Sequence, residues 1–272
     1  DVYKRQGVDI HLGRANANKL MFRFLKEAVR DYGARLSSVD GGSLRNAIPR
    51  EAFAVITIPG DNVEALWELV SDYREMYRYE YKGIEHNINF TAEMTDMPAT
   101  LIPEEIQDDL INAIEGCQNG VISMLVDFPG TVESSTNLAI VKSSNEMIEI
   151  QILVRSSSES RKEAVCSSLE SIFSLAGAKV EYSDGYGGWQ PNIDSPILKI
   201  MQQAYLDLYG KKPEAKVMHA GLECGIIQES YPDMDMISIG PDLQHPHSPD
   251  ERVSIPSVAR TWDFIVTTLA RI

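Results

Sequence analysis

The sequence is poor in basic residues and contains no long apolar run. Its 25 Lys and Arg are outnumbered by 40 Asp and Glu, which gives a formal net charge of −15 over 272 residues. Nucleic acids and anionic membrane surfaces attract basic proteins, so this charge argues against both as partners. No apolar run reaches the roughly 18 residues that a membrane-spanning helix needs, and the opening residues do not indicate a signal peptide. We therefore expect an acidic cytoplasmic protein.

Cysteine is also scarce. Cys117, Cys166 and Cys224 are odd in number, far apart and without a Cys-x-x-Cys pair. This pattern fits neither a disulfide framework nor a cysteine-based zinc site, and it predicts buried thiols in a reducing cytosol. No Cys-His pair accompanies Cys224, so a packed thiol is the favoured interpretation there rather than a nucleophile.

The first two thirds of the chain alternate helices and strands. Apolar residues from Ala17 to Ala28 recur at helical spacing, and Gly33 follows as a C-cap, which predicts a helix over residues 14–32. Asp61 is expected to cap the next helix. The same criteria predict helices over 61–73, 103–117 and 161–175 and strands over 35–39, 52–58, 83–93, 120–126, 138–142, 149–154 and 178–182. The apolar faces expected in the core are Val63, Leu66, Trp67 and Val70, and Ile106, Leu110, Ile111 and Ile114.

Two successive β-α-β-β-α-type units result from this order. We interpret them as ferredoxin-like lobes that share a sheet, at about residues 7–82 and 83–186, within one α+β domain. The turn-rich segment Gly185-Tyr-Gly-Gly-Trp-Gln-Pro191 is the expected boundary.

The pattern after the boundary, in residues 187–272, differs. Helices are predicted over 195–209, 222–229 and 256–269, with short strands over 215–218 and 236–239. This order is typical of α/β crossover architecture with parallel strands. Two strands cannot form a doubly covered sheet, so we expect the other strands to come from another segment.

His247 is the strongest candidate for a metal ligand. It follows the predicted strand Met236–Ile239, and open α/β sheets bind ligands at the carboxyl ends of their strands. A neutral imidazole suits zinc. The alternative is a capped loop, since Ser248, Pro249 and Asp250 are ordinary turn and N-cap residues. His245 lies two residues earlier, and in an extended segment it points the other way.

Several linked motifs carry a resemblance to a known family. They run in order from Val8-Asp-Ile-His11, Arg14-Ala-Asn-Ala17 and Arg45-Asn-Ala-Ile-Pro-Arg50 through Asn119-Gly-Val-Ile122 and Gly185-Tyr-Gly-Gly-Trp-Gln-Pro-Asn192 to His219-Ala-Gly-Leu-Glu-Cys-Gly225, Met236-Ile-Ser-Ile-Gly240 and Pro246-His-Ser-Pro-Asp-Glu-Arg252. This set resembles the aminoacyl-histidine dipeptidases, the cytosolic, carnosine-cleaving members of the di-zinc metallopeptidase superfamily. The family's Gly-Gly-His-Ser-Gly turn would precede Val8. Because it is absent, we expect residues 1–6 to be an artefact or join inside a longer protein.

The resemblance implies a fold and a metal centre. Residues 7–186 would form a two-lobed lid, and residues 187–272 the C-terminal part of an α/β zinc-peptidase catalytic domain. His247 would bind one of two zinc ions. The family's other ligands, including a His-x-Asp pair, and its Glu general base have no counterpart in this sequence. This chain alone is therefore expected to be inactive.

The resemblance also implies roles for four further residues. Asn46 would support the oxyanion and Arg155 would bind the substrate's terminal carboxylate, although Ser156 and Ser157 depart from the commoner Arg-Tyr-Pro pattern. Without the resemblance, Asn46 would be a turn residue and Arg155 a solvated strand end. His219 and Gly221 would belong to the substrate loop, while a packed loop histidine is the alternative for His219. Glu223 is interpreted as a residue of a helix's first turn.

The resulting hypothesis is a metal-dependent dipeptidase that hydrolyses Xaa-His and other dipeptides with zinc-activated water. Its partners would be a dipeptide substrate and a second copy of the protein in a homodimer. The alternatives are another hydrolase of the superfamily, such as a tripeptidase or an amino-acid deacylase, or a non-catalytic binding or dimerisation module that uses the lid fold.

Overall fold

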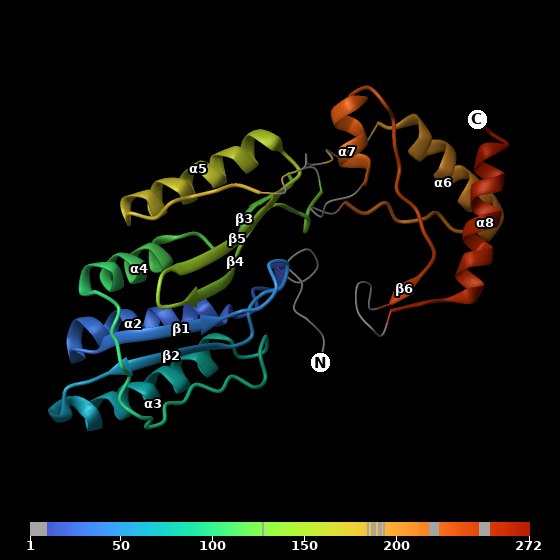
Figure 1. Ribbon diagram of the computed structural model, residues 1–272. Helices are drawn as coiled ribbons and strands as arrows, with labels where there is room; N and C mark the ends of the chain where they lie inside the picture. Colours follow the sequence, from blue (N-terminus) through green and yellow to red (C-terminus); the bar gives the residue numbers. More distant parts are fainter. Residues whose placement is uncertain are drawn as a thin grey trace. The chain divides into compact units, whose positions relative to one another are not determined.

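The computed structural model describes residues 10–126, 128–183, 185, 189, 192, 194–217, 223–244 and 251–272. The chain forms two compact units that divide after Gly185, and Figure 1 shows the order of their elements. The protein is of mixed α/β class, and both sheets of the described part are antiparallel. No helix in these ranges has both the length and the apolar character to cross a membrane.

The first unit is built on a five-stranded sheet. Its strands are β1 (Arg35–Gly41), β2 (Ala52–Thr57), β3 (Gly120–Met124), β4 (Val132–Ser143) and β5 (Ile148–Ser156). The long strand β4 is central: β5 pairs along one of its edges, while β3 and β1 pair with the two ends of the other edge. β1 and β2 come from the first predicted lobe and β3 to β5 from the second, so the two segments share one sheet.

Four helices share a core with one face of this sheet. They are α2 (Ala17–Tyr32), α3 (Val63–Glu80), α4 (Glu104–Gly116) and α5 (Glu159–Leu175), and the short 3₁₀ turns η1 (Ile10–Leu12) and η2 (Gly60–Asn62) precede α2 and α3. The strand residues that face this core include Leu36, Leu138 and Val141, which are almost fully buried. The helices therefore cover the face that these side chains define.

The predicted helix over 14–32 is confirmed as α2. Asn16 caps its N-terminus, where its Oδ1 accepts a hydrogen bond from Lys19 N at 3.2 Å. Gly33 ends the helix with φ of 70°, a left-handed conformation that glycine adopts without a steric penalty. Phe22, Phe24, Leu25 and Ala28 are buried.

The second unit contains α6 (Pro196–Tyr209), α7 (Glu223–Ser230), α8 (Ile255–Leu269) and the two-residue strands β6 (Leu243–Gln244) and β7 (Arg252–Val253). α6 and α8 lie side by side (Figure 1), where Met201 and Ala204 of α6 pack against Phe264 of α8. The hydroxyl of Tyr209 donates to Arg260 O at 2.8 Å and adds a polar contact between the two helices.

α8 also carries a second apolar stripe on its exposed surface. Trp262 is 66% exposed and Leu269 67% exposed. The stripe recurs at helical spacing and consists of Ile255, Val258, Trp262, Val266 and Leu269. α8 is thus apolar both toward α6 and on the side that this stripe occupies.

Two strands predicted for the first unit do not form. Residues 83–93 lie along α3 instead, where Arg74 Nε and Arg78 Nε donate to the carbonyl oxygens of Phe90 and Ile88 at 2.8 and 3.2 Å. The alternation of apolar and polar residues in this segment reflects burial of one side against a helix. Such a period-two pattern does not distinguish an extended segment packed on a helix from a strand in a sheet. Residues 178–182 similarly lie alongside α5, where the hydroxyl of Tyr182 is 2.9 Å from Glu170 Oε2.

The predicted parallel strands of the second unit are also wrong within the described residues. Residues 215–217 and Met236–Ile239 have no strand conformation, and Met218 lies outside the described ranges. A strand requires a paired neighbour for its backbone groups. Met236–Ile239 has none in this part of the chain, and Ile237 packs against the α6–α8 core instead.

Smaller corrections concern α3 and α4. Asp61 lies in η2 rather than at the helix cap, and α3 extends beyond residue 73 to Glu80 because Tyr73 and Tyr77 continue its buried stripe. Trp67 and Ile106, both expected in the core, are 40% and 50% exposed.

Candidate functional site

The predicted site residues fall into two groups. Asn46 and Arg155 belong to the first unit and are described. His219, Gly221 and His247 lie outside the described residues, as does His245. The geometry therefore tests how the chain positions Asn46 and Arg155.

Asn46 occupies a tight turn in the loop between β1 and β2. Ala47 N donates to Leu44 O at 3.1 Å, which closes the turn with Arg45 and Asn46 at its tip. Asn46 itself is exposed. An exposed amide on a closed turn can donate to a ligand without first losing an internal partner.

Two contacts hold the loop directly after this turn. Pro49 O accepts a hydrogen bond from Ala17 N at 3.0 Å, so the first turn of α2 fixes one end of the loop. Ile48 is 2% exposed and packs in a small apolar cluster with Ile10 and Val132. The loop is therefore anchored to a helix N-terminus and to β4.

Gly42 allows the loop to approach the sheet closely. Its φ is 77°, and a Cβ atom added there would overlap the carbonyl oxygen of Ala139 on β4. Both the backbone conformation and the available space require glycine at this position.

Arg155 and the Asn46 turn lie on the same face of the sheet. Arg155 of β5 is paired with Ser135 of β4, and Asn137 stands two residues further along the same side of β4. The Nδ2 of Asn137 donates to Ala47 O at 2.8 Å. We call this face, opposite the helices, the loop face. Asn46 and Arg155, 109 positions apart in the sequence, thus belong to segments that lie over the same face of the sheet.

Charged residues at one end of the loop face are already paired. Glu133 of β4 lies 3.1 Å from Arg161 Nε and accepts from Ser123 Oγ at 2.9 Å. Its carboxylate therefore neutralises Arg161 rather than presenting a free negative charge beside Ser135.

The described residues contain no group of three or more His, Cys, Asp or Glu side chains that could hold a metal ion. The predicted ligand, His247, lies outside these residues. The described part of the chain therefore contains two of the predicted site residues, Asn46 and Arg155, while the metal assignment depends on His247.

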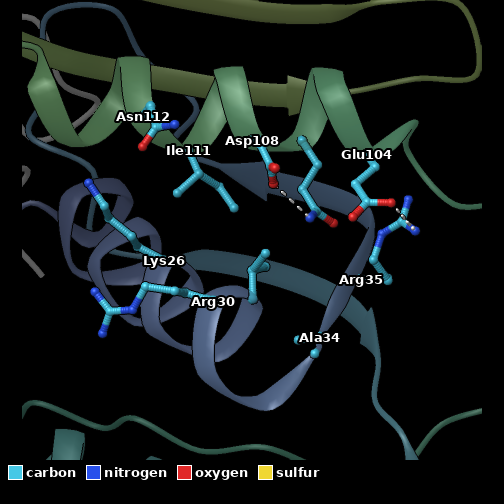
Figure 2. Close-up of a pocket in the computed structure, with 11 residues that line it drawn as sticks. Lys26, Arg30, Ala34, Arg35, Glu104, Asp108, Ile111 and Asn112 are labelled. Atoms are coloured by element: carbon cyan, nitrogen blue, oxygen red, sulfur yellow. Dashed lines mark hydrogen bonds and ion pairs between the residues drawn. The ribbon is translucent and has the colours of Figure 1, made fainter.

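A groove of about 440 Å³ lies elsewhere in the first unit, between α2 and α4. Figure 2 shows Lys26 and Arg30 on the α2 side, with Glu104 and Asp108 on the α4 side. Arg35 Nη1 lies 3.4 Å from Glu104 Oε2. None of the predicted site residues lines this groove, so it is not the site predicted from the sequence.

Sequence reasoning missed the asparagines beneath the loop. Asn16, Asn18 and Asn137 are at most 2% exposed. The signal that could have found Asn137 is a polar amide between Thr136 and Leu138 next to an apolar strand, because buried amides need specific partners. The identity of those partners, 90 residues away in the chain, was not visible in the pattern.

Comparison with known proteins places these features in context. The family model of the peptidase dimerisation domain matches residues 4–85. The cytosol non-specific dipeptidase of Escherichia coli is 40% identical over 266 residues, which are 98% of this chain and 55% of that protein. The crystal structure of aminoacylhistidine dipeptidase from Vibrio alginolyticus matches with a TM-score of 0.91 at 42% identity, over 98% of this chain and 55% of that one.

The chain thus spans about half the length of the relatives that it matches. The matched 98% of this chain includes residues of both units. The resemblance to aminoacyl-histidine dipeptidases that the sequence motifs indicated is confirmed.

Proposed function

We propose that the protein carrying this chain is a cytosolic, metal-dependent dipeptidase that hydrolyses Xaa-His and other dipeptides. The observation that carries this proposal is the common placement of Asn46 and Arg155 on the loop face, in a chain 40% identical to a cytosol non-specific dipeptidase. An amide donor and a guanidinium on one surface match two polar groups of a dipeptide, the carbonyl of its peptide bond and its terminal carboxylate.

Asn46 and Arg155 have distinct chemical roles in this proposal. The Asn46 amide donates to the carbonyl oxygen as negative charge develops on it, an interaction that is stronger in the transition state than in the ground state. The Arg155 guanidinium binds the terminal carboxylate bidentately. Binding the carboxylate selects substrates with a free C-terminus close to the scissile bond.

The remaining site residues are assigned from the resemblance. His247 would hold one of two zinc ions, and His219 and Gly221 would line the substrate loop. When bound, zinc supplies an activated water for attack on the peptide carbonyl. Glycine at position 221 lets the backbone approach the substrate closely.

We also propose that residues 7–186 act as the lid of this enzyme and residues 187–272 as the C-terminal part of its catalytic domain. The apolar stripe on α8, which includes Trp262 and Leu269, supports this proposal because an apolar helix face is stable when further polypeptide covers it. Met236–Ile239, apolar and without a paired strand in the described part, supports it in the same way. This chain by itself would be inactive.

A substrate panel tests the proposed reaction. The protein that carries this chain should hydrolyse Xaa-His and other dipeptides but not tripeptides or N-acyl amino acids. Asn46→Ala should lower kcat by roughly 100-fold, as expected when an oxyanion donor is lost. Asn112→Ala, which removes an exposed amide on α4, is the matched control and should leave kcat unchanged. Preferred cleavage of tripeptides or deacylation would contradict the proposal.

A second proposal is that the protein forms a homodimer through its first unit. The matched model of the peptidase dimerisation domain covers residues 4–85, which include β1 and β2. β2 ends the strand order, and its Phe53 is 65% exposed. Sedimentation equilibrium should give twice the monomer mass, and Phe53→Asp should shift the protein toward monomer if β2 lies in the interface.

A further inference from the structure

The side chain of Asn137 is completely buried and bonds to the turn that carries Asn46. It is 0% exposed. Its Nδ2 lies 2.8 Å from Ala47 O and 3.5 Å from Arg45 O, the carbonyls on either side of Asn46. One buried amide therefore contacts the backbone on both sides of the proposed oxyanion donor.

The orientation of this amide is fixed by a second buried asparagine. Asn16 Nδ2 lies 3.4 Å from Asn137 Oδ1 and 3.0 Å from both Leu138 O and Asn119 Oδ1. The Asn16 amide nitrogen can only donate, so the Asn137 side chain must turn its oxygen, rather than its nitrogen, toward Asn16. The amide nitrogen of Asn137 is then directed toward the Asn46 turn.

Asn16 is itself fixed at both ends of its amide. Its Oδ1 accepts from Lys19 N at 3.2 Å as the cap of α2. Asn119 Oδ1, which Asn16 contacts, also accepts from Leu138 N at 2.9 Å. The chain of hydrogen bonds therefore runs from the first turn of α2, across β4, to the loop. Buried amide networks of this kind rigidify the groups they connect when every member is satisfied.

We propose that Asn137 is a positioning residue for Asn46, which it holds in the geometry that supports the oxyanion. This inference rests on the proposed role of Asn46 in dipeptide hydrolysis. Asn137 does not act on the substrate. It fixes the two carbonyls that flank Asn46, so that the side chain of Asn46 keeps one direction relative to the loop face.

The other anchors make this role separable from folding. The hydrogen bond from Ala17 N to Pro49 O and the apolar cluster around Ile48 do not involve the Asn137 amide. The loop as a whole should therefore remain on the sheet while the turn at its tip gains freedom. Displacements of about 1 Å can lower a rate by about 100-fold, so a small gain in freedom has a measurable effect.

Steady-state kinetics of Asn137→Ser provide the first test, because serine is too short to reach Ala47 O. The kcat should fall by about 10-fold or more while KM stays within about twofold, since the affected interaction belongs to the transition state. Thr136→Val is the matched control. Thr136 is the neighbouring residue, equally buried, faces the helices, and its Oγ1 has no hydrogen-bond partner within the described ranges. This control should leave kcat unchanged.

A double-mutant cycle separates positioning from a general loss of structure. If Asn137 acts through Asn46, then Asn137→Ser should change kcat by less than about twofold in an Asn46→Ala background. Equal effects of Asn137→Ser in both backgrounds would overturn the proposal, as would an unchanged kcat in the single variant.

Hydrogen–deuterium exchange gives a readout that does not depend on activity. Peptides covering residues 43–49 should take up deuterium faster in Asn137→Ser than in the parent or in Thr136→Val, with the rest of the first unit unchanged. Unchanged uptake would overturn the proposal even if the protein is a dipeptidase. A parent protein without dipeptidase activity, together with faster uptake in Asn137→Ser, would instead refute the proposed function while supporting the structural link.

Discussion

The ammonium group of Lys19 lies 3.1 Å from Cys117 O, at the C-terminal end of α4. It also donates to Ile114 O at 2.6 Å and to Glu115 O at 2.9 Å. Carbonyls at a helix C-terminus lack an intrahelical N–H donor, although Ile114 O also accepts from Cys117 Sγ at 3.2 Å. A cation at a helix C-terminus also interacts favourably with the helix dipole. One side chain of α2 thereby fastens the end of the helix that leads into β3.

Lys19→Met should therefore lower the free energy of unfolding by about 1–2 kcal/mol, because three carbonyl groups lose a charged donor while the apolar stem is retained. Urea denaturation measures this change. Lys26→Met on the same helix is the matched control, since Lys26 is exposed, and its effect should stay within about 0.5 kcal/mol. Equal effects of the two substitutions would contradict the assignment.

Gly42→Ala should be one of the most damaging small substitutions in the first unit. The new Cβ would overlap Ala139 O, and the φ of 77° disfavours any L side chain. The two effects together should cost about 2–4 kcal/mol of stability in thermal or urea unfolding. Gly60→Ala, which meets open space and has no positive φ, should be nearly neutral. A stable Gly42→Ala variant with parent-like exchange in the loop would contradict this account.

Tyr77 should make the first unit sensitive to alkaline pH. Burial raises the pKa of the Tyr77 hydroxyl well above its usual value, and the hydroxyl donates to Leu20 O at 2.6 Å. Above pH of about 10 the unfolded chain loses this proton while the folded protein keeps it. The unfolded state then binds fewer protons, so the free energy of unfolding falls as pH rises.

Urea denaturation between pH 9 and 11 tests this expectation. Tyr77→Phe should cost about 1 kcal/mol at neutral pH, because a buried hydrogen bond is lost, and should reduce the decline above pH of about 10. Tyr79→Phe on the same helix is the control, since Tyr79 is 81% exposed, and it should retain the decline of the parent. A parent-like decline in Tyr77→Phe would show that another group titrates.

Arg155 should act on substrate affinity. Arg155→Lys keeps the charge but loses the bidentate geometry, so KM for dipeptides should rise by about 10-fold with a smaller change in kcat. Dipeptide amides lack the terminal carboxylate, and their kcat/KM should be unaffected by the same substitution. An equal loss of kcat/KM for both substrate types would exclude carboxylate binding by Arg155.

The sequence pattern predicted the helices of both units more reliably than the strands. A stripe such as the one from Leu20 to Ala28 reports burial and helical period together, and caps such as Asn16 and Gly33 mark its ends. The alternation in residues 83–93 reports burial alone, and the burying partner turned out to be α3 rather than a strand. A strand is defined by its neighbour, which local sequence does not contain.

The candidate site shows the same distinction. Asn46 and Arg155 were predicted from motifs, and the face that they share follows from the pairing of Arg155 with Ser135 and from the hydrogen bond between Asn137 and Ala47 O. The role proposed for Asn137 depends on hydrogen bonds between residues about 90 positions apart, which no local pattern encodes. The predicted strands of the second unit failed because Met236–Ile239 has no partner in the described part of the chain.

Metal dependence of dipeptide hydrolysis tests the central claim most directly. Initial rates with an Xaa-His dipeptide should be measured for the protein that carries this chain before metal removal, after chelation and dialysis, and after zinc is restored. We predict that activity is lost on chelation and returns with zinc, and that His247→Ala has low activity throughout. Full activity after metal removal, or parent-like zinc-restored activity in His247→Ala, would contradict the account.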